Sequence, residues 1–165
     1  MQFKRILAHL CCGHARVRRA FPAACLHRIE AGIREAEAGH SGEIRFAVEA
    51  SLPWAALMRG QSARERAIDV FSQLRVWDTE HNNGVLIYLL LADRDVEIVA
   101  DRGVNARVAQ PEWETICRAM ETHFRRGDFE AGMLAGIQAV AHHLRTHYPQ
   151  GSGDSNEIPD QAVIL

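Results

Sequence analysis

The sequence predicts an α/β fold, a single-domain α/β/α sandwich with a small mixed sheet that carries helices on both faces. Residues 85–91 are apolar throughout, which is typical of a central strand covered on two sides. Segments with helical spacing of apolar residues lie before and after this strand. With 165 residues, 47% of them hydrophobic, the chain is long enough for one domain with a substantial core.

The first half of the chain is predicted to form a helix, a strand and a second helix. Pro22 suits a first helical turn, and Gly39 and Gly42 punctuate the end of that helix. The alternation that follows predicts the strand. Ser62 and Glu65 form a capping box, in which each side chain bonds the other residue's backbone amide, so a helix is expected to start there. The positions expected to be buried are Cys25, Ile29, Ile33 and Ala36, then Ile44, Phe46 and Val48, then Ala67, Phe71 and Leu74.

The second half is predicted to form a hairpin and two helices. Residues 93–95 (Asp-Arg-Asp) make the turn, because aspartate accepts the backbone bonds that a tight turn leaves open. Pro111 lies in the first turn of the next helix, and Asp128 is expected to cap the last one. Gly132 and Gly136, one turn apart, permit close helix packing. The inward positions are Val96, Ile98 and Ala100, then Trp113, Ile116, Met120 and Phe124, then Phe129, Met133, Ile137, Val140 and Leu144.

The order of elements predicts the topology and the domain limits. The first two strands, joined through a helix, are expected to be parallel with a right-handed crossover, and the hairpin to be antiparallel. Residues 1–15 form a basic amphipathic lead-in, residues 16–148 the domain, and residues 149–165 a flexible, glycine-rich C-terminal tail. The apolar end of that tail is expected to dock on the domain or on a partner. Its residues are Val163, Ile164 and Leu165.

Composition excludes several classes of protein. The formal net charge of −2 and the lack of arginine interleaved with aromatic residues argue against nucleic-acid binding. The four cysteines form no C-x-x-C pair, so neither a zinc ribbon nor a redox motif is indicated. No stretch approaches the roughly 20 apolar residues of a transmembrane segment, and the N-terminus lacks the uninterrupted apolar run of a signal peptide. A cytoplasmic protein is therefore expected.

The basic N-terminal segment leaves two interpretations open. It can form an amphipathic helix that contacts the inner face of a membrane peripherally, or it can be a solvated lead-in that is partly docked on the domain. Its cationic residues are Lys4, Arg5, Arg16, Arg18 and Arg19.

Acidic and amide side chains are predicted to gather at two opposite ends of the sheet. At the first end, Asp78, Asn83 and Asp101 are candidate ligands for Ca²⁺ or Mg²⁺, because hard cations bind carboxylate and amide oxygens. The alternative is turn chemistry alone, since the spacing lacks the regular order of an EF-hand loop. Glu80 and Asn82 complete this group.

The second end is predicted to be structural. Asp93 and Asp95 are residues that a hairpin turn contains in any case, and Glu49 and Ser51 end the first strand. Likewise, His143 and His147 have the spacing of a shared metal site, but they fit a helix C-terminus, where an imidazolium complements the dipole. No motif identifies a catalytic residue or an organic cofactor.

Three blocks in order resemble the TPM domain family: "GEIRFAVEASL", "HNNGVLIYLLLADRDVEIVADRG" and "FRRGDFEAGMLAGI". The resemblance covers about residues 16–148. It implies an accessory or interaction domain with an unidentified protein partner. For members of this family, divalent-cation binding and phosphatase activity have both been proposed. The alternative function is therefore a metal-assisted phosphatase acting on phosphate monoesters, in which a cation held by Asp78 or Asp101 activates water and Arg102 neutralises phosphate charge.

Overall fold

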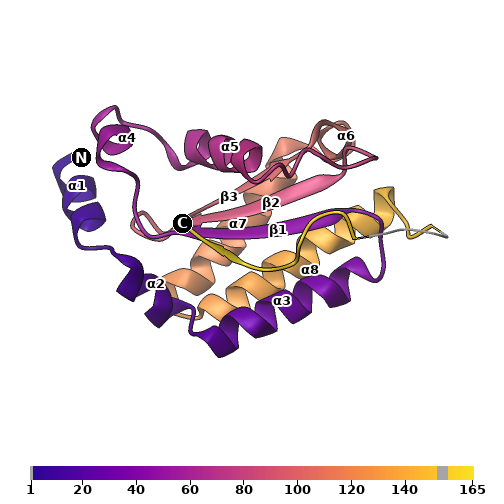
Figure 1. Ribbon diagram of the computed structural model, residues 1–165, viewed down its shortest axis with the longest axis horizontal. Helices are drawn as coiled ribbons and strands as arrows, with labels where there is room; N and C mark the ends of the chain where they lie inside the picture. Colours follow the sequence, from indigo (N-terminus) through magenta and orange to yellow (C-terminus); the bar gives the residue numbers. More distant parts are fainter. Residues whose placement is uncertain (1, 152–155) are drawn as a thin grey trace.

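A four-stranded mixed sheet in the order β3-β2-β1-β4 forms the centre of the molecule. The computed structural model describes residues 2–151 and 156–165 (Figure 1). The strands β1 and β2 are parallel, with Glu43 opposite Gly84, and β2 and β3 are antiparallel, with Val85 opposite Ala100. The predicted parallel crossover and antiparallel hairpin are therefore confirmed. The strands are β1 (Glu43–Glu49), β2 (Gly84–Leu90), β3 (Asp95–Ala100) and β4 (Val163–Ile164).

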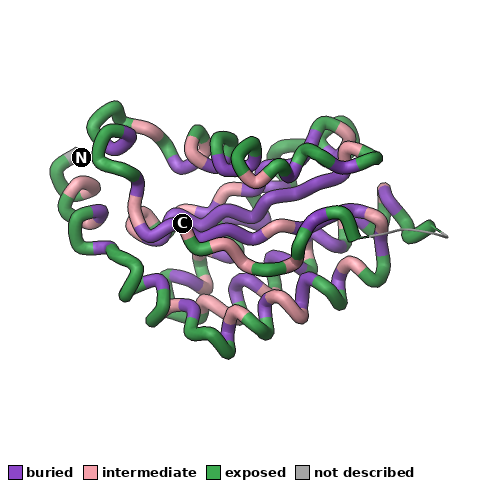
Figure 2. The backbone as a smooth tube through the Cα atoms, viewed as in Figure 1, coloured by how far each residue is buried: buried purple, intermediate pink, exposed green. Residues whose placement is uncertain are grey.

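Helices cover both faces of this sheet, as predicted. Three long helices cover one face: α3 (Ala23–Glu37), α7 (Gln110–Arg126) and α8 (Phe129–His147). The other face carries α5 (Ala63–Gln73) with the short α4 (Trp54–Met58), and α6 (Arg102–Asn105) follows β3. The α/β/α sandwich follows directly from the burial of β2, which is buried at every position (Figure 2).

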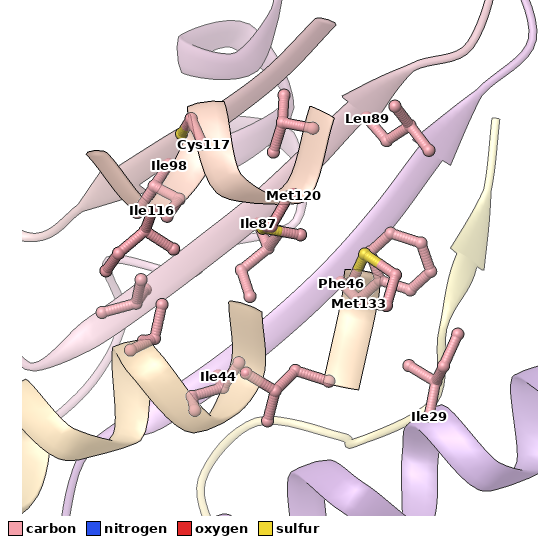
Figure 3. Close-up of a cluster of buried hydrophobic side chains, with 14 of the residues drawn as sticks. Ile29, Ile44, Phe46, Ile87, Leu89, Ile98, Ile116, Cys117, Met120 and Met133 are labelled. Atoms are coloured by element: carbon pink, nitrogen blue, oxygen red, sulfur yellow. The ribbon is translucent and has the colours of Figure 1, made fainter. Parts of the chain in front are cut away.

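Side-chain alternation along the strands divides the core in two. On the side of the long helices, Phe46, Ile87 and Ile98 meet Ile29 and Met120 (Figure 3). The opposite side is smaller and contains Leu86, Tyr88 and Leu90 with residues of α4 and α5. Because neighbouring residues of a strand point to opposite faces, one apolar strand supplies both halves of the core.

Local signals set several helix boundaries. The capping box is present: the Glu65 amide donates to Ser62 Oγ at 3.1 Å, and the Ser62 amide donates to Glu65 Oε2 at 2.8 Å. Gly127 ends α7 with a left-handed φ of 87°. Asp128 occupies the N-cap position of α8, but its side chain makes no capping hydrogen bond, which corrects the expected role. A Cβ on Gly132 would approach Phe124 to 2.7 Å, so the predicted close contact between α7 and α8 is present.

The N-terminal residues form two helices, α1 (Gln2–Leu10) and α2 (His14–Ala20), at the end of the sheet where β1 and β2 finish (Figure 1). The predicted lead-in is thus helical and contacts the domain. Among the described helices, none has the length and apolar character needed to cross a membrane.

The C-terminal residues 156–165 differ from the mobile tail that their composition predicts, but their apolar end docks on the domain, as one of the two expectations for it stated. Val163 pairs with Ala47 of β1, and the Leu165 amide donates to Val48 O at 2.9 Å. Ile158 is 5% exposed and belongs to the smaller core. The physical reason is that the edge of β1 away from β2 is free to pair with the backbone of β4, and that Ile158 packs into the smaller core. Residues 152–155 of the predicted tail lie outside the described residues.

Candidate functional site

The amino end of β2 lies against the carboxyl end of β3, as the hairpin predicts. The Asp101 amide donates to Gly84 O at 2.8 Å, and the Gly103 amide donates to Asn82 O at 3.1 Å. Asn82 adopts a left-handed φ of 51°, one of the conformations that turn chemistry predicts for it. We call residues 82–84 with 101–103 the amino-end site.

Asn83 is a buried amide with one unused oxygen. Its backbone amide donates to Thr79 Oγ1 at 3.1 Å, and its Nδ2 donates to Ser41 O at 2.6 Å. The side chain is 0% exposed, and within residues 2–151 and 156–165 no donor reaches Oδ1. A buried acceptor without a donor costs free energy, which a bound cation or water would recover.

Asp101 likewise uses one carboxylate oxygen and leaves the other free. Oδ1 accepts a hydrogen bond from the Arg102 amide at 2.7 Å at the start of α6. Oδ2 is buried and has no hydrogen-bond partner in the described part of the chain. Arg102 itself is exposed, and its Nε donates to Asn82 Oδ1 at 2.9 Å, which places a positive charge at the rim.

Strand alternation limits how these two oxygens can cooperate. Ala100 faces the long helices, so the extended Asp101 is directed to the opposite face, whereas Asn83 shares the side of Val85. One ion can therefore contact both side chains only beyond the end of the strands. The carbonyl oxygens of His81 and Asn82 lie there, close to Gly103.

Asp78 lies apart from this pair in an exposed loop. Its Oδ2 forms an ion pair with Arg75 at 3.0 Å, and the two side chains are 54% and 70% exposed. Across the described residues, no three His, Cys, Asp or Glu side chains gather in a way that could hold a metal ion. The side-chain oxygens of Asn83 and Asp101 are of the types that hard cations bind in proteins.

The opposite end of the sheet contains acids that are already neutralised. Glu49 is bound by both Nε and Nη2 of Arg66, at 2.8 and 3.0 Å, and also accepts the Tyr88 hydroxyl at 2.7 Å. Burial, followed by the neighbouring Glu49, raises the pKa of Tyr88, so this hydroxyl stays protonated and keeps donating. These residues form a buried structural network with no free position for a ligand atom.

Asp93 does more than close the hairpin, which corrects the prediction for this residue. Its carboxylate pairs with Arg5 at 2.9 Å and with His9 Nε2 at 3.0 Å, so it attaches α1 to the domain. The Leu52 amide donates to His9 Nδ1 at 3.0 Å, and this assigns the imidazole proton to Nε2. The residues that bind Asp93 are more than 80 positions away in sequence, so local patterns could not reveal them.

Asp95 faces a groove of about 380 Å³ between β3 and α7 rather than the turn. Burial, then the negative charges of Glu97 and Glu121, raises the pKa of Asp95 to about 6. Arg64 reaches across the same edge and donates to Ile98 O at 2.6 Å, which blocks part of the open strand. These acids, together with Arg64 from α5, shield the open edge of β3 from pairing with another strand.

The histidines of α8 have structural partners. His143 Nδ1 lies 3.4 Å from Glu112 Oε2, and its ring meets Trp113 edge-on. Burial lowers the pKa of His143, which favours the neutral ring. The carbonyl of His147 accepts a hydrogen bond from Arg107 at 2.7 Å. His143 thus has partners within the protein, and its neutral ring does not supply the imidazolium that the helix-end interpretation requires.

Two carboxylates near the start of β1, the half-buried Glu37 and the buried Glu43, were not identified from the sequence. Glu37 accepts the Ile44 amide at 2.7 Å, and burial raises its pKa to about 8. Glu43 accepts the amides of Glu157 and Ile158 at 3.1 and 3.2 Å and so fixes the C-terminal segment. A separation of more than 110 residues leaves no short-range signal for the second contact.

A family model described as the TPM domain matches residues 20–143. Among solved structures, the BA42 protein from the psychrophilic bacterium Bizionia argentinensis is similar, with 31% identity, a TM-score of 0.77, and coverage of 88% of this chain and 95% of that one. The N-terminal domain of a P. gingivalis protein is 21% identical, with a TM-score of 0.61 and coverage of 78% and 81%. The N-terminal domain of the cg2496 protein from Corynebacterium glutamicum is 14% identical, with a TM-score of 0.56 and coverage of 82% and 80%. These last two show the fold alone, and no curated protein sequence matches the chain.

Proposed function

This chain belongs to the TPM domain family, and from that premise we propose that it is an interaction domain that binds a divalent cation, Ca²⁺ or Mg²⁺, at the amino-end site. The observation that carries the proposal is a pair of buried oxygens without a hydrogen-bond partner in the described part of the chain, Asn83 Oδ1 and Asp101 Oδ2, which flank the paired ends of β2 and β3. Such oxygens are the ligands that hard cations use.

The coordination assigns different parts to the three predicted ligands. Asp101 supplies the negative charge, and Asn83 supplies an amide oxygen that needs no rearrangement of its Nδ2 bond to Ser41. Asp78 is the third candidate, and it contributes only by exchanging its ion pair with Arg75 for the cation. Waters fill the remaining positions, so millimolar affinity is expected.

A titration of the full chain with CaCl₂ or MgCl₂, followed by amide NMR shifts, tests this proposal. Shifts are expected at residues 78–84 and 101–105 and should be lost in Asp101→Asn, which keeps the size of the side chain but removes its charge. Asp128→Asn is the matched control, because Asp128 is exposed and its side chain caps no helix. If those residues stay still at millimolar metal, the cation site is rejected.

Metal-assisted hydrolysis of phosphate monoesters is the second candidate function. Its supporting observation is Arg102, whose exposed guanidinium lies beside Asp101 and Asn82 and could neutralise phosphate charge. Turnover of a generic phosphate ester by the purified chain should then require Mg²⁺ and fall in both Asp101→Asn and Arg102→Gln. Turnover that these substitutions leave unchanged would belong to another site or to a contaminant.

A further inference from the structure

The helix α1 is attached to the domain through its polar side. Arg5 bonds Asp93 and donates to Gln61 O at 2.9 Å, while His9 lies between Asp93 and the Leu52 amide. His9 is 4% exposed, although a histidine is among the more polar residues of this helix. The inward face of α1 therefore combines these charged and hydrogen-bonded contacts with Ile6, its one apolar side chain packed against the smaller core.

The apolar face of α1 points to solvent as a consequence. Phe3, Leu7 and Leu10 are 78%, 53% and 67% exposed, and their i, i+4, i+7 spacing places them on one helical stripe. A helix that merely packs on its own domain buries such a stripe, so this orientation is the reverse of the usual one. On α4, at the same end of the molecule (Figure 1), Trp54 and Met58 are 58% and 52% exposed. Exposed apolar side chains gathered in this way mark an interaction surface.

The N-terminal part of the chain that carries this apolar surface is also rich in positive charge. The first 29 residues contain six Lys or Arg and no Asp or Glu. Arg5 and Arg28 pair with acids of the domain, whereas Arg16 and Arg19 line a hollow of about 410 Å³ together with Arg94. The remaining lining residues of that hollow carry no acid, so it suits an anion such as phosphate. They are Ala20, Leu91, Gly127 and Phe129.

We propose that this end of the molecule docks on a bilayer surface that contains anionic phospholipid. The apolar side chains of α1 and α4 enter the boundary between headgroups and acyl chains, and the arginine hollow takes a lipid phosphate. Amphipathic helices with basic flanks lie in membrane interfaces in this way, held by apolar burial and by the negative surface potential. We call this region the docking surface. It consists of Phe3, Leu7, Leu10, Trp54 and Met58 with Lys4, Arg16, Arg18, Arg19 and Arg94.

Charge complementarity selects this occupant over a second copy of the chain. A two-fold symmetric contact would bury the arginines of both copies in one interface, and the docking surface contains no Asp or Glu to pair with them. An anionic bilayer instead offers negative charge around an apolar interior, in the same arrangement as the positive rim and apolar centre of the docking surface.

Sedimentation of the full chain with lipid vesicles tests the proposal. Binding is expected to vesicles of phosphatidylcholine with phosphatidylglycerol and to be lost with phosphatidylcholine alone. Leu7→Ser/Leu10→Ser should weaken it by about tenfold or more, because two exposed apolar contacts are removed. Ile68→Ser is the matched control, since Ile68 is 47% exposed on α5 and lies outside the docking surface. Equal binding to both vesicle types, no binding, or equal loss in the control would overturn the proposal.

Tryptophan fluorescence locates the contact independently. Trp54 lies in the docking surface, whereas Trp77, 46% exposed, lies in the loop before β2 at the opposite end of that strand. A blue shift with anionic vesicles should persist in Trp77→Phe and vanish in Trp54→Phe. The reverse pattern would place the membrane at the amino-end site and contradict the proposal.

Two further arms separate lipid from other occupants. Arg16→Gln/Arg19→Gln should reduce vesicle binding more than Arg118→Gln/Arg145→Gln, which removes two exposed arginines elsewhere.

Inorganic phosphate added without vesicles should leave the amide NMR signals of residues 16–20 unmoved at concentrations below those of vesicle lipid. Saturable binding of free phosphate would assign the hollow to a soluble anion, and a dimer in gel filtration that Leu7→Ser/Leu10→Ser dissociates would assign the surface to a second copy. Either result overturns docking on lipid.

Discussion

At the end of the sheet where β1 and β2 finish, Glu49 and Asp93 are each held by an arginine. At the opposite end, Asn83 Oδ1 and Asp101 Oδ2 are buried without a hydrogen-bond partner in the described part of the chain. Near this second end, at the start of β1, the carboxylate of Glu37 accepts the Ile44 amide, and burial raises the pKa of Glu37 to about 8. Glu49 and Asp93 are thus paired with arginines of the protein, whereas Asn83 and Asp101 each keep one buried oxygen without a partner among the described residues.

The two ends of the sheet therefore suit different ligands. A paired carboxylate is already neutralised. The docking proposed for the first end therefore relies on the apolar side chains and arginines that lie around these pairs. Buried oxygens without a partner among the described residues are atoms of the kind that hard cations bind, so the cation proposed above would bind at the second end. Asp95 is the exception at the first end, because it lies in the groove beside α7 and its pKa is raised to about 6.

The largest expected effect comes from Arg66. Arg66→Met leaves Glu49 buried without its cation and should lower the free energy of unfolding by about 3 kcal/mol or more in urea denaturation. The neighbouring Arg64→Met is the matched control, since the Arg64–Glu97 pair is more exposed and the loss should be smaller. Equal losses would mean that the pair at this end is not the buried anchor described above.

Docking of the C-terminal segment should come next in size. Ile158→Ala removes a buried side chain held above the amino ends of the strands and should cost about 2 kcal/mol in the same denaturation measurement. Ile164→Ala, at a position 41% exposed in β4, should cost far less. A negligible effect of both would show that residues 156–165 do not contribute to the stability of this end.

Detachment of α1 should cost about 1–2 kcal/mol. Asp93→Ala removes the acceptor shared by Arg5 and His9, so the helix loses its charged hydrogen bonds to the turn. Hydrogen exchange of residues 5–11 should become faster, while that of β2 stays slow. Unchanged exchange in α1 would contradict the assignment of Asp93 as its anchor.

The last prediction concerns pH. The pKa of Glu37 is raised from its ordinary value of 4.5 to about 8, so the folded state holds this proton more tightly than the unfolded state. The contribution of Glu37 to stability is therefore full below about pH 4.5 and declines as pH rises toward 8. Glu37→Gln keeps an acceptor for the Ile44 amide and should flatten the change in melting temperature between pH 5 and pH 8. The exposed Glu35→Gln on the same helix should leave that slope unaltered.

Prediction from sequence succeeded where the signal is local or periodic. The capping box at Ser62, the apolar run of β2 and the spacing of apolar residues in α8 are patterns that few other structures satisfy, and each is present. The pairing of residues 82–84 with 101–103 followed from hairpin register. Asp78, Asn83 and Asp101 stay a prediction as cation ligands, and the fold adds that the last two directly flank the paired strands β2 and β3, whereas Asp78 lies in an exposed loop.

What sequence alone determined is the α/β/α sandwich, its parallel crossover and its hairpin, because hydrophobic period and turn chemistry act over a few residues. Tertiary structure decided which distant segments meet: Asp93 binds α1, Glu43 binds the C-terminal segment, and β4 pairs with the edge of β1. It also decided that α1 turns its polar side inward. An ion pair between distant residues leaves no periodic trace, since the chain between them can take any pattern, so only the folded molecule shows it.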